Sequence, residues 1–330
     1  MSIQVLQPYL AEQYENFPKG RTIGAVVLRK TESETIFRTE GSGEPLCSEY
    51  VAAGHTAQET IPRLVMTKRK QVAPERRKGR ELLRRHDLLF DSPKGKTPCT
   101  LNSNDPCEKC VDCFLYGFAA GGGGAQKSRI WTEDAFSVLP ATELIGDRTI
   151  NAIFETGTMR DPEGKASTAL NTSEYIKPGA HFLDVVTFKD VTAGELQYAL
   201  GNILLTTRYG AVSSRTGRME NKILGVFGGH SELPSCLELV QSVYDAIEAD
   251  KREHPLDSRH LEEATKSIIS QWTDRRGISK QLSESELSEL INEVDDNLKE
   301  DNQAAFLQQL SDRYEPWRKA PESSKKAKKK

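Results

Sequence analysis

The stretch HFLDVVTFKDVTAGELQYALGNILLTTRYGAVSSRTGRMENKILGVFGG, residues 181–229, decides the fold. It begins with β-branched and aromatic side chains, which predict a strand in a half-buried sheet. Thr192 and Glu195 have the spacing of a capping box, and apolar residues then recur at helical spacing. We expect the helix to stop at Gly210 and a second strand to follow the next loop. The stretch therefore predicts the order strand, helix, loop, strand.

The loop in this stretch, residues 209–218, combines glycines, hydroxyl groups, two guanidinium groups and an aromatic ring. An isolated stretch of this composition is usually a flexible hairpin. Here it follows a helix that packs on a sheet, where backbone amides and arginine side chains can hold successive phosphates. We therefore predict that the loop contacts a phosphate backbone.

The composition is that of a soluble globular protein with one elaborated domain or two, since 37% of its 330 residues are apolar and 28% are charged. No run of about 18 apolar residues exists, so we expect no membrane span. The first residues lack the basic start and apolar centre of a signal peptide. Six cysteines, four of them close together, argue against a secreted disulfide scaffold. We expect a cytoplasmic protein.

The net charge of -3 hides a strong segregation of charge along the chain. Residues 61–90 carry ten Lys or Arg against three Asp or Glu, whereas residues 237–315 carry nine basic and nineteen acidic residues. A charge run is usually a solvated helix face. Ten cations in thirty residues nevertheless suit a track for a polyphosphate, and the pattern predicts a polyanion-binding face opposite an acidic helical face.

Four cysteines have the spacing of metal ligands: Cys99, Cys107, Cys110 and Cys113. Two residues between thiolates let a tight turn direct both sulfurs at one ion, and four sulfurs complete a tetrahedron. We predict a structural zinc site, with an iron–sulfur cluster as the main alternative and His86 as an alternative ligand. We expect Cys47 and Cys236 to be ordinary buried thiols.

Glycine-rich residues 121–128 nearly match the phosphate-binding loop of nucleoside triphosphatases, but Gln126 stands at the second glycine, so we exclude that function. Residues 148–157 alternate like a strand, residues 158–178 are polar, and the next strand is expected near Ala180. Two strands joined by a long polar insertion predict a projecting hairpin. After Pro234 the apolar residues recur at helical spacing.

The order of these segments resembles the RAMP superfamily of CRISPR proteins and, more narrowly, the crRNA-binding backbone subunit of type I-D Cascade. The segments that carry the resemblance are IPRLVMTKRK (61–70), the four cysteines, LYGFAAGGGG (115–124), SRIWTEDAF (128–136), RTINAIFETGTM (148–159) and RYGAVSSRTGR (208–218). The match runs from about residue 21 to residue 229. The C-terminal helical region contributes little to it.

The resemblance implies an α+β fold: a ferredoxin-like (RRM-type) core with a zinc-binding insertion, a thumb-like hairpin and a C-terminal helical region. The expected division is residues 1–90, the first part of the core with the basic segment; 91–118, the zinc insertion; 119–157, core; 158–178, the thumb-like hairpin; 179–233, core with the RNA-binding loop; 234–317, the helical region; and 318–330, a disordered basic tail.

The resemblance also implies a non-catalytic subunit that oligomerises along the guide RNA and presents it to target DNA beside other Cascade subunits. The residues expected to contact RNA are Lys68, Arg69, Lys70, Arg76, Arg77, Lys78, Lys127, Arg129, Tyr209, Ser213, Ser214, Arg215 and Arg218. The aromatic signature of ordinary RRMs is absent, so we expect backbone contacts that are indifferent to guide sequence. The alternatives are a target-cutting endonuclease that uses Glu44 and, more remotely, an RNA-processing enzyme that uses His55 and His86.

Overall fold

A large antiparallel sheet forms the centre of the molecule in a computed structural model that describes residues 2–15, 17–37, 46–92, 98–100, 105–120, 124–151, 157–160, 163–165, 170–212 and 215–318. The strands of this sheet are β1 (Thr22–Thr31), β2 (Ser48–Ala52), β3 (Thr60–Met66), β6 (Ile130–Thr132), β7 (Ala135–Pro140), β10 (His181–Lys189), β11 (Arg208–Val212), β12 (Arg215–Gly229) and β13 (Ile278–Gln281). Within the described ranges the order is β11-β12-β1-β10-β7-β3-β2, with β13 paired to β12 and β6 paired to β10.

Strand β1 shows why the sheet is covered on both faces. Ile23, Ala25 and Val27 belong to one apolar cluster, whereas Val26 and Leu28 belong to another. Successive side chains of a strand point to opposite faces, so a strand buried on both sides is apolar at nearly every position. The sheet is therefore the middle of three layers.

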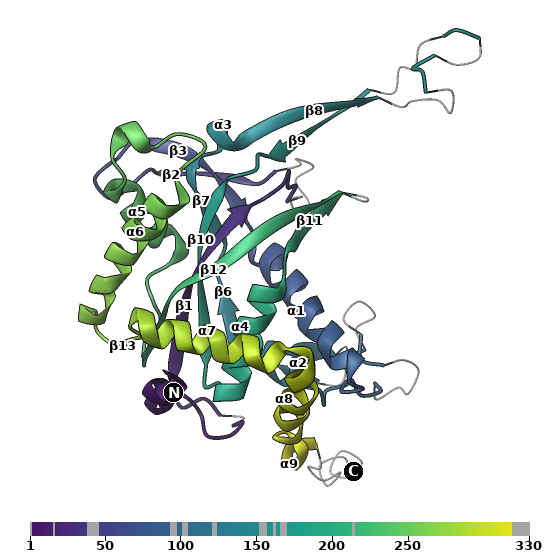
Figure 1. The fold of residues 1–330 in the computed structure, drawn as a ribbon, viewed down its shortest axis with the longest axis vertical. Helices are drawn as coiled ribbons and strands as arrows, with labels where there is room; N and C mark the ends of the chain where they lie inside the picture. Colours follow the sequence, from purple (N-terminus) through teal and green to yellow (C-terminus); the bar gives the residue numbers. More distant parts are fainter. Residues whose placement is uncertain are drawn as a thin grey trace, which may run out of the picture.

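Helices form the two outer layers (Figure 1). One cluster joins the sheet to η1 (Ser2–Tyr9), α1 (Lys68–Arg85), α2 (Val111–Tyr116), α4 (Ala193–Leu205), α7 (Glu284–Leu298) and α8 (Glu300–Asp312). The other joins it to α3 (Ala141–Leu144), α5 (Cys236–Ala246), α6 (Ser258–Ile269) and η3 (Ser270–Asp274). The short η2 (Ala249–Lys251) follows α5, and α9 (Glu315–Arg318) follows α8. In the described part of the chain, no helix combines the length and the apolar character needed to cross a membrane.

Two small hairpins stand apart from the central sheet. Strands β4 (Phe118–Ala120) and β5 (Gly124–Gln126) form one of them. Strands β8 (Ile145–Asn151) and β9 (Leu170–Ile176) form the other, which projects beyond the sheet (Figure 1). A projecting hairpin was predicted, but its second strand was expected near Ala180, where β10 of the central sheet begins. The partner of β8 is β9, which lies within residues that were expected to be a polar insertion without a strand.

The stretch that opened the sequence analysis folds as strand, helix, strand, strand. Its capping box is confirmed, because the Thr192 side chain accepts from the Glu195 amide and the Glu195 side chain accepts from the Thr192 amide. The prediction that the helix stops at Gly210 was wrong. Helix α4 ends at Leu205, since Thr206 is already extended with φ -86° and ψ 112°.

Gly210 lies in β11 at φ +64°, where an added Cβ would approach the Ile36 carbonyl oxygen to 2.3 Å. The predicted loop 209–218 is therefore largely two paired strand ends, with Tyr209 opposite Gly217.

The described residues confirm a mixed fold of helices and antiparallel strands. Of the predicted basic tail, residues 318–330, only Arg318 is described, and it ends α9.

Candidate nucleic-acid interface

Helix α1 carries most of the basic segment. It begins at Lys68, six residues before Pro74, so Pro74 is inside the helix. Its first turn holds Lys68, Arg69 and Lys70 and no acidic residue. The positive end of the helix dipole disfavours cations at this end by about 0.3–1 kcal/mol each. These cations therefore lower the stability of the helix, which suits a role in binding an anion.

A buried network holds the inner side of α1 against the sheet. Arg29 of β1 lies 2.7 Å from the Asp184 carboxylate and 2.8 Å from the Glu75 carboxylate of α1. The Tyr209 hydroxyl donates to Glu75 at 3.0 Å and accepts from the Asn221 amide at 2.9 Å. Burial disfavours the charged form of Arg29, yet the two carboxylates raise the pKa of its guanidinium well above the ordinary value. Burial also raises the pKa of Glu75, against the opposing effect of Arg29.

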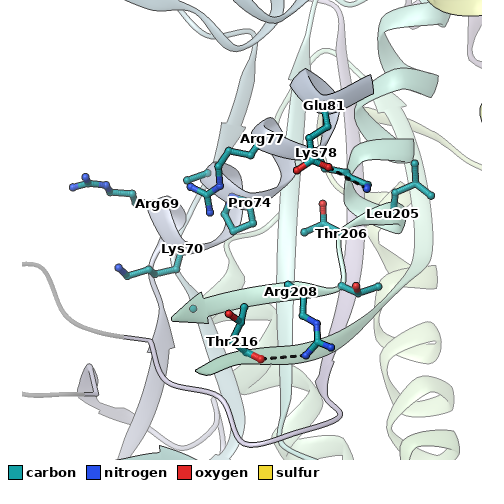
Figure 2. Close-up of a pocket in the computed structure, with 13 residues that line it drawn as sticks. Arg69, Lys70, Pro74, Arg77, Lys78, Glu81, Leu205, Thr206, Arg208 and Thr216 are labelled. Carbon is teal, nitrogen blue, oxygen red and sulfur yellow. Dashed lines mark hydrogen bonds and ion pairs between the residues drawn. The ribbon is translucent and has the colours of Figure 1, made fainter. Parts of the chain in front are cut away.

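This network fixes the separation of α1 from the β11–β12 hairpin, because it joins Glu75 on the helix to Tyr209 on β11. A groove of about 940 Å³ lies between them (Figure 2). Its lining includes five cationic side chains and one carboxylate: Arg69, Lys70, Arg77, Lys78, Arg208 and Glu81. The carboxylate lies 3.3 Å from Lys78 Nζ. An open groove with such an excess of positive charge attracts polyanions.

Arg208 was not among the residues predicted from the sequence. It is exposed at the start of β11 and donates to the Thr216 carbonyl of β12 at 3.2 Å (Figure 2). Its neighbour Tyr209, which was predicted, is buried. Alternation along a strand would have separated the two residues, but the segment was interpreted as a loop, in which alternation has no meaning.

The structure brings four of the predicted RNA contacts together in the groove: Arg69, Lys70, Arg77 and Lys78. Lys68 is exposed at the start of the same helix, and Arg218 is exposed on β12. Lys127 does not line the groove; it is exposed with Nζ 4.6 Å from the centre of the Trp131 ring.

Three predicted contacts are engaged inside the protein. Arg129 is 8% exposed and donates to the Glu195 carboxylate at 2.9 Å. Burial raises the pKa of Glu195, but Arg129 and the Thr192 amide outweigh it, so the pKa lies below the ordinary value. Tyr209 belongs to the buried network, and Arg76 is in an ion pair with Asp112 at 2.8 Å. Ser213, Ser214 and Glu44 lie outside the described residues, as does the side chain of Arg215.

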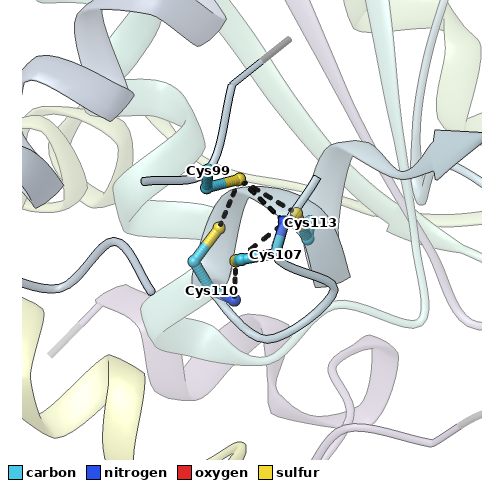
Figure 3. A group of neighbouring side chains, drawn as sticks. All are labelled: Cys99, Cys107, Cys110 and Cys113. Atoms are coloured by element: carbon cyan, nitrogen blue, oxygen red, sulfur yellow. Dashed lines mark hydrogen bonds between the residues drawn. The ribbon is translucent and has the colours of Figure 1, made fainter. Parts of the chain in front are cut away.

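The four predicted metal ligands meet in one place beside α1 (Figure 3). All four cysteines are buried, and their sulfurs lie within 4.8 Å of one another. The Cys99 sulfur is 3.9 Å from that of Cys110 and 3.7 Å from that of Cys113. With Zn–S bonds of about 2.3 Å, the sulfurs of a tetrahedral site lie about 3.8 Å apart. The cluster can therefore hold a single metal ion.

Donors around the cluster favour thiolate sulfur. The Cys107 amide donates to the Cys99 sulfur at 3.2 Å, and the Cys110 amide donates to the Cys107 sulfur at 3.2 Å. Arg80 of α1 donates to the Cys99 sulfur at 3.4 Å and to Asp112 at 2.8 Å. These contacts tie the cluster to the inner side of α1.

The positions of His86, Cys236 and Cys47 test three further predictions. His86 is not a ligand, because its Nε2 lies 3.0 Å from the Gln303 side-chain oxygen and it is not part of the cysteine cluster. The C-terminal end of α1 carries His86 toward α8. Cys236 is a buried thiol, as expected, whereas Cys47 is only partly buried.

These observations define a mixed α/β protein with a cationic groove between a helix and a β-hairpin and with a buried four-cysteine cluster beside that helix. The family model described as Csc2 Crispr matches residues 9–307. The chain therefore belongs to the Csc2 family of CRISPR proteins, which confirms the CRISPR part of the resemblance.

A solved structure supports the fold. The crystal structure of Thermofilum pendens Csc2 is similar with a TM-score of 0.61 and 19% identity, over 95% of this chain and 96% of that one. A chain of a "CRISPR RNA-guided surveillance complex, pre-nicking" has a TM-score of 0.45 and 9% identity, over 76% of this chain and 89% of its own. A chain of a "Type IV-B CRISPR Complex" has a TM-score of 0.42 and 12% identity, over 61% and 90%. No curated protein matches the chain.

Proposed function

We propose that this protein is a non-catalytic backbone subunit of a type I-D CRISPR effector complex, and that it binds the guide RNA along the groove between α1 and β11–β12. The observation that carries the proposal is the charge of the groove lining, whose described residues include five cations and one carboxylate. Membership of the Csc2 family supports it. Lysine and arginine contacts to phosphates give affinity without reading sequence, as a subunit that coats any guide requires.

The lining of the groove favours binding over cutting. Among the lining residues that the structure describes there is no histidine, and the one carboxylate, Glu81, is paired with Lys78. Such a set provides no general base beside a reacting phosphate. Glu44, the residue considered for an endonuclease, lies outside the described residues.

The residues around the groove have two roles on this view. Lys68, Arg77 and Arg208, which are exposed, and Lys70, which is half-buried, contact the RNA backbone. Buried Tyr209 acts indirectly, since it holds the two walls of the groove in place through Glu75.

We also infer that the core is ferredoxin-like. The neighbouring strands β12, β1, β10 and β7 have the order of that motif, with α1 and α4 packed on each other on one face. Beside α1, the four cysteines hold Zn²⁺ in a structural role, since four protein ligands leave no open position for water. Sulfurs at 3.7 and 3.9 Å suit a single ion bonded to all of them.

Equilibrium binding of two unrelated single-stranded RNAs over a range of salt concentrations tests the proposal. The variant Lys70→Ala/Arg77→Ala/Arg208→Ala removes three groove cations. We expect weaker binding of both RNAs by a similar factor, and a slope of log K against log salt that is smaller by about 2, since each lost phosphate contact contributes about 0.7.

The matched control is Lys222→Ala/Lys251→Ala/Lys299→Ala, which removes three lysines that pair with carboxylates outside the groove. It should bind almost as the unmodified protein does. Equal losses in both variants would show that net charge and not the groove binds RNA. A strong preference for one RNA would contradict backbone recognition.

Assembly gives an independent test. A subunit that coats a guide makes head-to-tail contacts, which extend unless the rotation closes a ring. Native mass spectrometry on guides of graded length should show subunits added in whole steps. One fixed stoichiometry at every length would exclude a filament on RNA. Addition of matched DNA should then give a complex only when the guide is present.

A further inference from the structure

The short helix α9 contacts the cysteine cluster at one of its turns. Arg318 Nε donates to the carbonyl of Lys109, which stands between Cys107 and Cys110, at 2.8 Å. The same guanidinium lies 4.4 Å from the centre of the Phe90 ring, and this ring packs against the cluster. Arg318 therefore contacts the turn that carries two of the four sulfurs, and it covers a ring beside them.

This turn has a backbone conformation that needs support. Glu108 has a φ of 60°, in the left-handed region, which is unfavourable for a residue with a side chain. The Lys109 and Cys110 amides donate to the Cys107 sulfur at 3.4 and 3.2 Å, so the sulfur that binds a metal ion also holds the turn together. If the ion leaves, we expect the turn to relax and the Lys109 carbonyl to move away from Arg318.

The two ends of α9 are held in different ways. Tyr314, just before the helix, is buried and stacks on the Phe114 ring with 4.5 Å between the ring centres and 7° between the planes. At the other end, Trp317 is 40% exposed, and Arg318 donates to the Ser311 carbonyl of α8 at 2.8 Å. The Ser311 contact orients the guanidinium, and the contact with the turn completes the closure. The firm end of α9 is therefore Tyr314, whereas the anchoring of its last residue depends on the cysteine turn.

We propose that α9 is a strap that Arg318 closes over the metal-binding turn: the strap slows the loss of the metal ion, and the ion keeps the strap closed. This inference rests on the metal ion proposed for the cluster and is independent of RNA binding in the groove. The ion leaves when the turn opens, and that opening breaks the hydrogen bond of Arg318. Because both events share this contact, the ion and the strap must stabilise each other by the same factor.

The rate of metal loss tests the strap from the side of the metal. The zinc-loaded protein is mixed with an excess of a chromophoric zinc chelator, whose absorbance follows the transfer of Zn²⁺. We expect Arg318→Ala to lose Zn²⁺ faster by about ten-fold or more, which is the usual contribution of a hydrogen bond to a charged group. Arg318→Lys keeps a donor of the same charge and should have an intermediate rate.

The matched control is Arg252→Ala, because Arg252 makes the same two kinds of contact in the layer on the other face of the sheet. It donates to the Ile247 carbonyl at 2.9 Å and lies 4.3 Å from the centre of the Tyr244 ring. Its rate of metal loss should equal that of the unmodified protein. Thermal unfolding verifies that the variants fold, and Arg318→Lys decides the outcome if the alanine variant does not.

Hydrogen exchange of the unmodified protein tests the reverse direction. The amides of Trp317 and Arg318 donate to the Tyr314 carbonyl at 3.0 and 3.1 Å, so their exchange reports whether α9 is formed. Removal of Zn²⁺ by chelation under reducing conditions should speed exchange in this segment and leave α5 unchanged. In Arg318→Ala the segment should exchange quickly even with Zn²⁺ bound, and chelation should add little.

The outcomes separate the strap from the proposals for the metal and for the groove. An unchanged rate of metal loss in a folded Arg318 variant overturns the strap. Equal acceleration in Arg252→Ala, or faster exchange throughout the chain on chelation, also overturns it, because either shows a general loss of structure. Protein isolated without zinc would overturn the metal proposal itself. The salt slope of RNA binding should be unchanged in Arg318→Ala, so failure of the groove is detected independently.

Discussion

Helix α1 has two charged sides that differ in what surrounds them. On the outer side Arg77 faces the groove, where cations greatly outnumber carboxylates. On the inner side its neighbour Arg76 donates to Asp112 and to the Gly117 carbonyl. The same residue type at consecutive positions therefore has opposite uses. A compensated cation stabilises the fold, whereas an uncompensated one on the surface remains available to an external anion.

The inner side also supports the outer one. Three cations in the first turn oppose the helix dipole, and interior Pro74 removes a backbone hydrogen bond. The ion pairs of Glu75 with Arg29 and of Arg80 with Asp112 hold the helix in place despite these costs. Each of the following changes affects one side of α1 and not the other.

The largest expected effect follows from Cys110→Ser, on the inner side. Structural Zn²⁺ contributes on the order of 10 kcal/mol in zinc-finger peptides, so the loss of one ligand should cost several kcal/mol of stability. Thermal unfolding and elemental analysis of the bound metal measure this. Cys47→Ser, outside the cluster, is the control and should leave both unchanged. Unchanged stability of Cys110→Ser, or isolation of the protein without zinc, would contradict a metal site on the inner side of α1.

Arg76→Ala should destabilise the protein by about 2–3 kcal/mol, because it leaves the buried Asp112 with Arg80 alone. Urea unfolding gives the value. Arg76→Lys, which keeps a cation near Asp112, should recover part of the loss. Unchanged stability of Arg76→Ala would show that the ion pair does not stabilise the fold. Arg76 would then be a candidate RNA contact, as predicted from the sequence.

Gly79→Ala tests how closely α1 packs on α4. Replacement of an exposed helical glycine by alanine normally stabilises the protein by about 1 kcal/mol. Here the new Cβ would lie 2.3 Å from the Tyr198 hydroxyl and 2.4 Å from the Asn202 amide nitrogen. We expect a net loss of about 1–2 kcal/mol in calorimetric unfolding. A gain in stability would mean that the two helices separate easily.

Arg77→Ala should change stability least, within about 0.5 kcal/mol, because surface substitutions rarely exceed this. Its effect should appear in RNA binding, as a salt slope smaller by about 0.7. Fluorescence anisotropy with labelled RNA measures it beside Arg76→Ala. Equal effects of the two variants on stability and on slope would abolish the distinction between the sides of α1.

Local features of this fold could be predicted from the sequence because neighbouring residues determine them. The strand at residues 181–189, the capping box of α4 and the grouping of four cysteines depend on short spacings. The partner of a charged residue does not depend on a short spacing, because it can lie far away in the sequence. Arg76 meets Asp112 and Arg29 meets Asp184 only after the sheet has formed, so the basic run could not be divided into inner and outer sides.

Arg208, on the far wall of the groove, was missed for a related reason. The glycines and serines of residues 209–218 suggested a loop, but antiparallel pairing makes its two ends strands. Strand geometry places Arg208 at the surface and Tyr209 in the interior. Charge segregation along the chain did locate the near wall, because α1 collects its cations from one contiguous segment.

The network beneath the groove constrains how this chain can diverge from its relatives. Arg29, Glu75, Asp184, Tyr209 and Asn221 come from five elements and are joined in one set of hydrogen bonds. A substitution at one position leaves a buried charge or hydrogen-bond donor of the network without its partner. Breaking a buried ion pair in this way costs several kcal/mol of stability. We therefore expect the residues at these five positions to change together in evolution. In related sequences an apolar residue in place of Arg29 should accompany uncharged residues at the positions of both Glu75 and Asp184.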